Sequence, residues 1–136
     1  MIDKPLDREV IVLLAVDEPI VRGMVEKLLK QGGYELVIAA DGQDAIQKAD
    51  EHKGRLDLLL CDIQMPGMTG PDLAKELRRA RPDLRAMMIG AYPQGLLVLD
   101  AGWHFIQKPF LAKVLLEKIV EVMKKPPSPN TDRGQS

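Results

Sequence analysis

Short apolar runs alternate along this chain with stretches of helical periodicity, and this alternation limits most strongly the folds that it can adopt. Residues 10–16 (VIVLLAV) form an unbroken apolar run, rich in Val, Ile and Leu. Such a run is typical of a strand that is buried on both faces of a sheet. Similar runs recur along the chain, and they predict strands at 10–16, 34–39, 56–61, 84–89 and 103–107.

Helical patterns fill the segments between these runs. Pro19 suits the first turn of a helix, where its missing N–H costs nothing, and Gly32 and Gly33 end that helix. Asp41 can cap a second helix, and Pro71 begins a third. A short helix at most is expected within 92–100, and a last one at 111–125. The side chains expected to face inward include Val21, Met24, Val25 and Leu28 in the first helix, and Leu111, Leu115, Ile119 and Val122 in the last.

Five β–α units in succession predict an α/β fold, a doubly wound parallel sheet of five strands with helices on both faces. The 136 residues correspond to one domain. We expect an N-terminal extension at 1–9, the folded domain at 10–125 and a disordered tail or linker stub at 126–136. The tail has no large apolar side chain whose burial could offset the entropy lost on ordering.

Charge and composition exclude several classes of function. Nineteen Lys and Arg residues stand against twenty Asp and Glu, so direct nucleic-acid binding through phosphate neutralisation is not expected. No apolar stretch is long enough to span a membrane. The single cysteine excludes an internal disulfide, and the charged N-terminus does not read as a signal peptide, so we expect a cytoplasmic protein.

Charged residues follow three of the predicted strands. Asp17 follows the first strand, Asp62 the third and Lys108 the fifth. Each alone is more often a cap, a turn residue or a solvated charge. Together they meet at the carboxyl edge of a parallel sheet, where ligands bind in such folds. Two carboxylates and one ammonium group suit phosphoryl transfer to an aspartate in the presence of Mg²⁺.

The same residues lie within three longer motifs, VDEP at 16–19, LCDIQMPGMTG at 60–70 and FIQKPF at 105–110. In these motifs the chain resembles the receiver domains of two-component response regulators. The amino-acid sequence of these motifs is most similar to that of receivers attached to hybrid sensor kinases. This resemblance implies a flavodoxin-like fold with strand order 2-1-3-4-5.

The resemblance also implies a role for each residue at this edge of the sheet. Asp62 would be the phosphoacceptor, and Mg²⁺ would bind Asp17, Asp62 and the backbone carbonyl of Gln64. Lys108 and the backbone N–H of Ala91 would hold the phosphoryl group, and the peptide bond after Lys108 would be cis. The phosphodonor would be a histidine kinase or a phosphotransfer protein, while the downstream partner is not identified and a homodimer stays open.

The chain departs from the family pattern in ways that affect this site. Val16 stands where the family usually has an acid, so Mg²⁺ binding is expected to be weak unless Glu18 acts as an auxiliary acid. Gly90 occupies the position of a switch Ser or Thr, whose hydroxyl it cannot replace. Phe105 holds the position of the switch aromatic residue, although plain core packing would explain it equally well. The segment from Gly90 to Lys108 is shorter than usual by about one helical turn.

Two functions therefore stay open, a phosphoacceptor receiver and a pseudo-receiver that binds proteins without being phosphorylated. We do not expect an enzyme. A phosphatase of similar topology needs an acid where this chain has Gln64. A flavodoxin-like electron carrier needs a phosphate-cradling loop where Asp17 would repel a phosphate.

Overall fold

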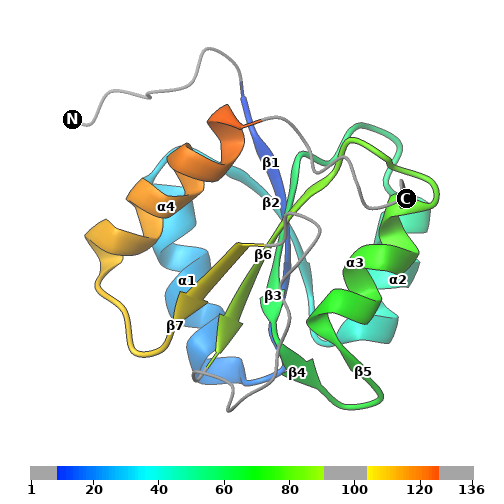
Figure 1. The fold of residues 1–136 in the computed structure, drawn as a ribbon, viewed down its shortest axis with the longest axis horizontal. Coiled ribbons are helices and arrows are strands. Elements are labelled where there is room, and N and C mark those ends of the chain that lie inside the picture. The colour runs from blue at the N-terminus through cyan, green and yellow to red at the C-terminus, as the bar shows by residue number, and fades with distance from the viewer. Residues whose placement is uncertain (1–8, 91–103, 126–136) are drawn as a thin grey trace.

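The computed structural model describes residues 9–90 and 104–125 (Figure 1). Several predictions fall outside these ranges and stay predictions. They are the backbone N–H of Ala91, the short helix within 92–100, and the extension and tail at the two ends of the chain.

Five parallel strands form the central sheet, as the sequence predicts. They are β1 (Ile11–Ala15), β2 (Glu35–Ala39), β3 (Leu58–Asp62), β6 (Arg85–Gly90) and β7 (His104–Gln107). Their order is β2-β1-β3-β6-β7, which is the predicted 2-1-3-4-5 order of the main strands. The winding reverses next to β1, so the carboxyl ends of β1 and β3 border the crevice where such sheets bind ligands.

Among the described residues, two helices cover each face of the sheet (Figure 1). One face carries α1 (Pro19–Gln31) and α4 (Ala112–Lys124), and the other carries α2 (Gly42–Glu51) and α3 (Gly70–Arg78). Side chains alternate along each strand, so Leu14 packs toward α1 and α4 whereas Leu13 packs toward α2 and α3. The sheet therefore separates two apolar clusters. Strands β1, β3 and β6 are buried on both sides, whereas the edge strands β2 and β7 are partly exposed.

Local signals position the helix ends. Pro19 occupies the first turn of α1, and Gly33 follows its C-terminus with φ at 90°. The Asp41 carboxylate accepts a hydrogen bond from the backbone N–H of Asp44 at 2.8 Å, which caps α2 as predicted. The start of α3 has a capping box between Thr69 and Asp72 that the sequence analysis did not identify.

Two residues predicted to lie in the core are exposed, so the prediction is wrong for them. Met24 is 50% exposed because the buried face of α1 passes through Val25 and Leu29 instead. Leu111 is 72% exposed because it is the N-cap residue of α4 and precedes the turns that contact the sheet. Helical spacing identifies a stripe, but it places the edges of that stripe poorly.

A small hairpin lies between β3 and α3. Strand β4 (Gln64–Met65) pairs with the antiparallel strand β5 (Met68–Thr69), and Gly67 turns between them with φ at 83°. This φ favours glycine. In the described part of the chain, every helix is too short or too polar to cross a membrane.

Candidate functional site

Asp17, Asp62 and Lys108 meet at the carboxyl edge of the sheet. The backbone N–H of Asp17 donates a hydrogen bond to Oδ2 of Asp62 at 3.2 Å. The Nζ atom of Lys108 lies 4.0 Å from Oδ1 of the same carboxylate. The two oxygens of Asp62 therefore have different neighbours, and the predicted juxtaposition of the three residues is present.

Asp62 is the last residue of β3 and is 6% exposed. Burial raises the pKa of its carboxyl and so does the Asp17 side chain, whereas the Asp17 N–H and Lys108 lower it, and together these effects give a pKa of about 6. The carboxyl is still mostly ionised at neutral pH. It is thus an anion with little water around it, which favours interaction with a cation.

Backbone contacts fix the direction in which Lys108 leaves the sheet. Its N–H donates to the carbonyl of Gly90 at 2.8 Å, which continues the pairing between β6 and β7. The peptide bond to Pro109 is cis, as the family resemblance implies. The Lys108 side chain is 34% exposed, so it is both anchored at its base and accessible at the mouth of the crevice.

The segment that carries Gln64 is fastened at both ends. The N–H of Ile63 donates to the carbonyl of Ile89 at 2.9 Å, and the N–H of Gly70 donates to the carbonyl of Ile63 at 2.8 Å. A Cβ atom on Gly70 would lie only 2.6 Å from the carbonyl oxygen of Asp62. Glycine at this position therefore allows α3 to approach the end of β3.

The donor set fits a magnesium ion. Within residues 9–90 and 104–125, no three His, Cys, Asp or Glu side chains gather closely enough to form a metal site by themselves. Mg²⁺ does not need such a group, because it binds through one or two carboxylates and retains several waters. Asp17 and Asp62 supply two carboxylates, and the backbone carbonyl of Gln64 would be a further oxygen ligand.

The residues beside Asp17 contribute differently from the acids of the family pattern. Val16 is fully buried in the cluster with α1 and α4, so it offers no ligand. Glu18 is exposed at the N-cap of α1 and makes no side-chain capping hydrogen bond. Arg22, which no sequence signal marks, donates to the carbonyl of Val16 at 2.7 Å and holds the β1–α1 connection in place.

Ile63 fills the space next to Gly90. A Cβ atom on Gly90 would lie 3.0 Å from Cγ2 of Ile63, so the methyl group occupies the space into which a Ser or Thr side chain would extend. No sequence signal marks Ile63 for this position. Phe105 lies on β7 and packs against the cluster with α2 and α3, as does Ile63.

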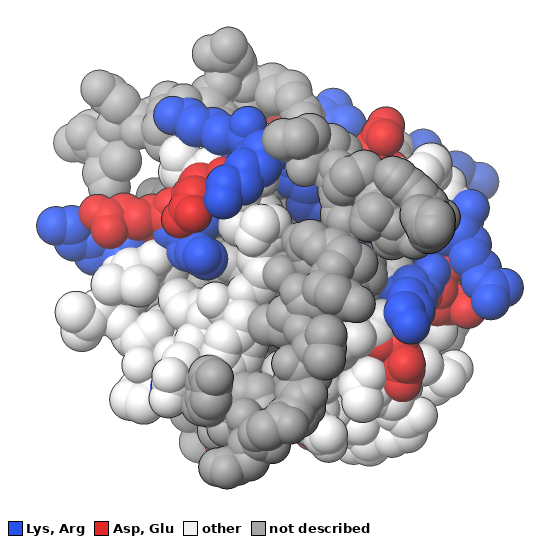
Figure 2. All heavy atoms as spheres, viewed as in Figure 1, with Lys and Arg blue, Asp and Glu red and all other residues white. Residues whose placement is uncertain are grey.

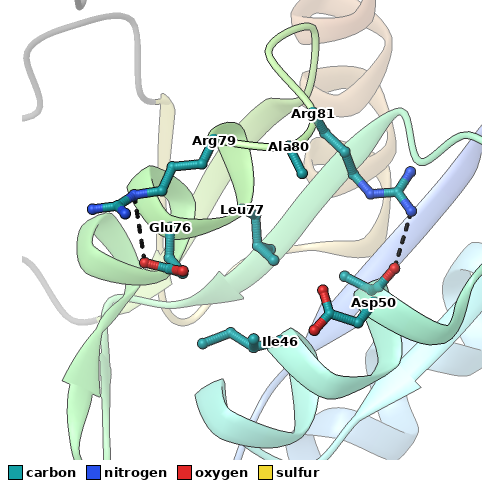
Figure 3. Close-up of a pocket in the computed structure, with 8 residues that line it drawn as sticks. Ile46, Asp50, Glu76, Leu77, Arg79, Ala80 and Arg81 are labelled. Carbon is teal, nitrogen blue, oxygen red and sulfur yellow. Dashed lines mark hydrogen bonds and ion pairs between the residues drawn. The ribbon is translucent and has the colours of Figure 1, made fainter.

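A groove of about 450 Å³ lies between α2 and α3 (Figure 3). Ile46 and Leu77 point into it, and Glu76 forms an ion pair with Arg79 at 3.7 Å on its rim. Its lining includes none of the predicted site residues. The candidate site is therefore the carboxyl edge of the sheet and not this groove.

Comparison with known proteins agrees with this geometry. The family model described as "Response regulator receiver domain" matches residues 12–120. The chain is 35% identical over 118 residues to the sensor kinase CckA of Brucella abortus, covering 84% of this chain but 12% of that protein. It is also 35% identical over 113 residues to the chemotaxis protein CheY of Bacillus subtilis, covering 79% of this chain and 92% of CheY.

Among solved structures, the response regulator TrrA of Thermotoga maritima, in complex with Mg²⁺–BeF, has a TM-score of 0.72 and 30% identity. The match covers 83% of this chain and 98% of TrrA. The fold, the arrangement of the carboxyl edge and these matches agree with one another: the chain belongs to the response regulator receiver domain family of two-component signalling.

Proposed function

We propose that this chain is an active phosphoacceptor, which takes a phosphoryl group from a phosphohistidine onto Asp62. The observation that carries the proposal is the environment of this carboxylate. Asp62 is nearly buried, yet one oxygen accepts the Asp17 N–H and the other faces the ammonium group of Lys108. A buried carboxylate with an accessible lysine beside it is suited to attack a phosphoryl group.

In the proposed step, one oxygen of Asp62 attacks the phosphorus atom of the donor. The new P–O bond forms an acyl phosphate, and the P–N bond to the donor imidazole breaks. The electron pair of that bond stays on the imidazole nitrogen. The imidazole takes up one proton from water and leaves as neutral histidine. Lys108 attracts the phosphoryl oxygens and so holds the group in line with Asp62.

The bound cation would be held by Asp17, Asp62 and the Gln64 carbonyl, and it supplies neutralisation of the charge on the transferring group. The side chain at position 64 is an amide, which cannot protonate a leaving group. We therefore propose that the chain receives phosphoryl groups in a relay and is not an enzyme with its own substrate turnover.

The proposed partner is the histidine-containing domain of a kinase or a phosphotransfer protein. Large apolar side chains are exposed in the first half of α1 and at the start of α4, namely Ile20, Met24, Leu111 and Val114. Figure 2 shows uncharged surface at the lower left, where Figure 1 draws the β7–α4 connection. An apolar area next to the crevice supports docking of a protein donor over Asp62.

A cytoplasmic location belongs to the same proposal, supported by the buried free thiol of Cys61.

The test is phosphoryl uptake from a small donor. The purified chain is incubated with Mg²⁺ and acetyl phosphate, and intact mass is measured alongside the variants Asp62→Asn, Lys108→Ala and Asp83→Asn. We expect the mass of one phosphoryl group on the wild type and on Asp83→Asn, whose side chain is exposed and remote from the crevice. Asp62→Asn should stay unmodified, and Lys108→Ala should be modified more slowly.

The pseudo-receiver is the competing function, favoured by the buried Val16 and by the methyl group that fills the space at Gly90. It predicts no mass gain in any variant. It also predicts that Mg²⁺ with beryllofluoride leaves the amide spectrum of wild type and Asp62→Asn equally unchanged. That pair of results would refute the phosphoacceptor proposal.

A further inference from the structure

The β4–β5 hairpin is too short to hold its own position. Its ladder consists of two residue pairs, Gln64 with Thr69 and Met65 with Met68. Isolated hairpins, even longer ones, are at best marginally stable in water. The hydrogen bonds at Ile63 and Gly70 fix the base of the hairpin but do not reach its far half. Further contacts must hold the strands themselves.

The Met68 side chain makes such a contact with the beginning of α2. A Cβ atom on Gly42 would lie 2.5 Å from Sδ and 2.6 Å from Cγ of Met68. The thioether therefore rests directly on the Cα of Gly42, in the space that any other residue would fill with its own side chain. Gly42 is buried as the first residue of α2, and Met68 packs against the apolar cluster between this helix and the sheet.

We infer that Met68 is a positioning residue for the backbone carbonyl of Gln64, with Gly42 as its seat. Met68 pairs with Met65, and its neighbour Thr69 pairs with Gln64, so a displacement of Met68 moves the strand that presents this carbonyl. The inference rests on the proposed function in one respect, because the carbonyl of Gln64 matters only if the crevice binds a cation. It links the N-terminus of α2 to that cation site.

The test compares two glycine-to-alanine variants. Gly42→Ala adds a methyl group in the space that Met68 occupies, while Gly23→Ala adds one on the exposed surface of α1, with nothing within 4 Å. Both sites have helical backbone, so the backbone conformation of each accepts alanine, which favours the helix. The two variants therefore differ in the contact of the added methyl group with Met68.

Amide chemical shifts without metal give the first readout, and Mg²⁺ titration gives the second. We expect Gly42→Ala to shift the amides of Gln64 and Thr69 and to weaken Mg²⁺ binding by about 10-fold, the usual cost of disturbing a support of a metal ligand. Gly23→Ala should match the wild type in both readouts. In a Met68→Ala background, adding Gly42→Ala should cause no further loss of affinity.

Two failures can be told apart. Unmoved Gln64 and Thr69 amides in Gly42→Ala, with Mg²⁺ affinity equal to that of Gly23→Ala, would overturn the positioning role of Met68. A wild type that neither responds to Mg²⁺ nor gains mass from acetyl phosphate would count against the proposed function instead. In that case the metal-free amide shifts would still decide whether Met68 positions the hairpin.

Discussion

Gly90 has no side chain, and the side chain of Ile63 occupies the space beside it. The Cγ2 methyl of Ile63 would be 3.0 Å from a Cβ atom on Gly90, closer than such atoms normally approach. The missing hydroxyl at this position is visible in the sequence. The methyl group that occupies this space is visible only in the fold. The hydrogen bond from the N–H of Ile63 to the carbonyl of Ile89 brings Ile63 next to Gly90.

Gly90→Ala should therefore lower the free energy of unfolding by about 1 kcal/mol, as overpacking of a core does. In an Ile63→Ala background the same change should be neutral or slightly stabilising, because the space is then open. Urea denaturation of the four proteins gives the coupling between the two positions. If Gly90→Ala lowers the free energy of unfolding equally in both backgrounds, the contact with Ile63 is not the reason why glycine is favoured at position 90.

The same crowding limits any attempt to restore a switch hydroxyl. Threonine at position 90 needs more room than alanine, so Gly90→Thr alone would have to displace Ile63. The sequence shows only that position 90 lacks a hydroxyl. The structure adds that Ile63 occupies the adjoining space, a contact for which the spacing of the motifs contains no signal.

The helices differ in how well side chains cap their N-termini. In α3, Thr69 Oγ1 accepts the N–H of Asp72 at 3.1 Å, and the Asp72 carboxylate accepts the N–H of Thr69 at 3.4 Å. By contrast, α1 and α4 begin at Glu18 and Leu111 without a side-chain capping hydrogen bond. Because α3 follows the hairpin with Gln64, the cap at Thr69 also fixes the end of that hairpin.

Removing this cap should have a measurable cost. Thr69→Ala is expected to lower the free energy of unfolding by about 1 kcal/mol, because the N–H of Asp72 loses its acceptor. Thr69→Ser keeps the hydroxyl and is the matched control. Chemical denaturation of both variants decides the point, and equal stability of the alanine and serine variants would contradict it.

The elements that the sequence predicts well are those with a strong local pattern. Apolar runs such as 10–16 identify every strand of the main sheet to within two residues at its ends in the described chain, because burial on both faces leaves little choice of side chain. The β4–β5 hairpin was missed because two-residue strands have no periodicity to detect. The cap at Thr69 could have been found, since Thr69 and Asp72 have the spacing of a capping box.

Across the whole molecule, the sequence places Asp17, Asp62 and Lys108 at one edge because parallel topology leaves no alternative. It does not predict how deeply Asp62 is buried or which surface surrounds the crevice. Leu111 illustrates the limit. Helical spacing assigns it to the core, yet it is exposed at the N-cap of α4, where leucine is a poor residue. The proposed docking of a phosphodonor gives this exposed leucine a role that neither packing nor capping provides.

Leu111→Ser separates the effect of residue 111 on the stability of α4 from its proposed role in binding the phosphodonor. Serine can cap α4, so the variant should be more stable than the wild type by about 1 kcal/mol in urea denaturation. Phosphorylation by acetyl phosphate should be unchanged, because a small donor needs no docking surface. Transfer from a phosphorylated histidine phosphotransfer protein that labels the wild type should be slower, because the apolar contact with the donor is lost.

Lys124→Ser, at the exposed C-terminal end of α4, controls for the loss of a side chain far from the crevice. It should transfer at the wild-type rate from both donors. Equal rates of protein-donor transfer for Leu111→Ser and Lys124→Ser would remove Leu111 from the docking surface, even if the gain in stability were observed. A stabilised receiver with a selective defect toward protein donors would instead show that the exposed leucine is retained for recognition at the expense of the helix that it begins.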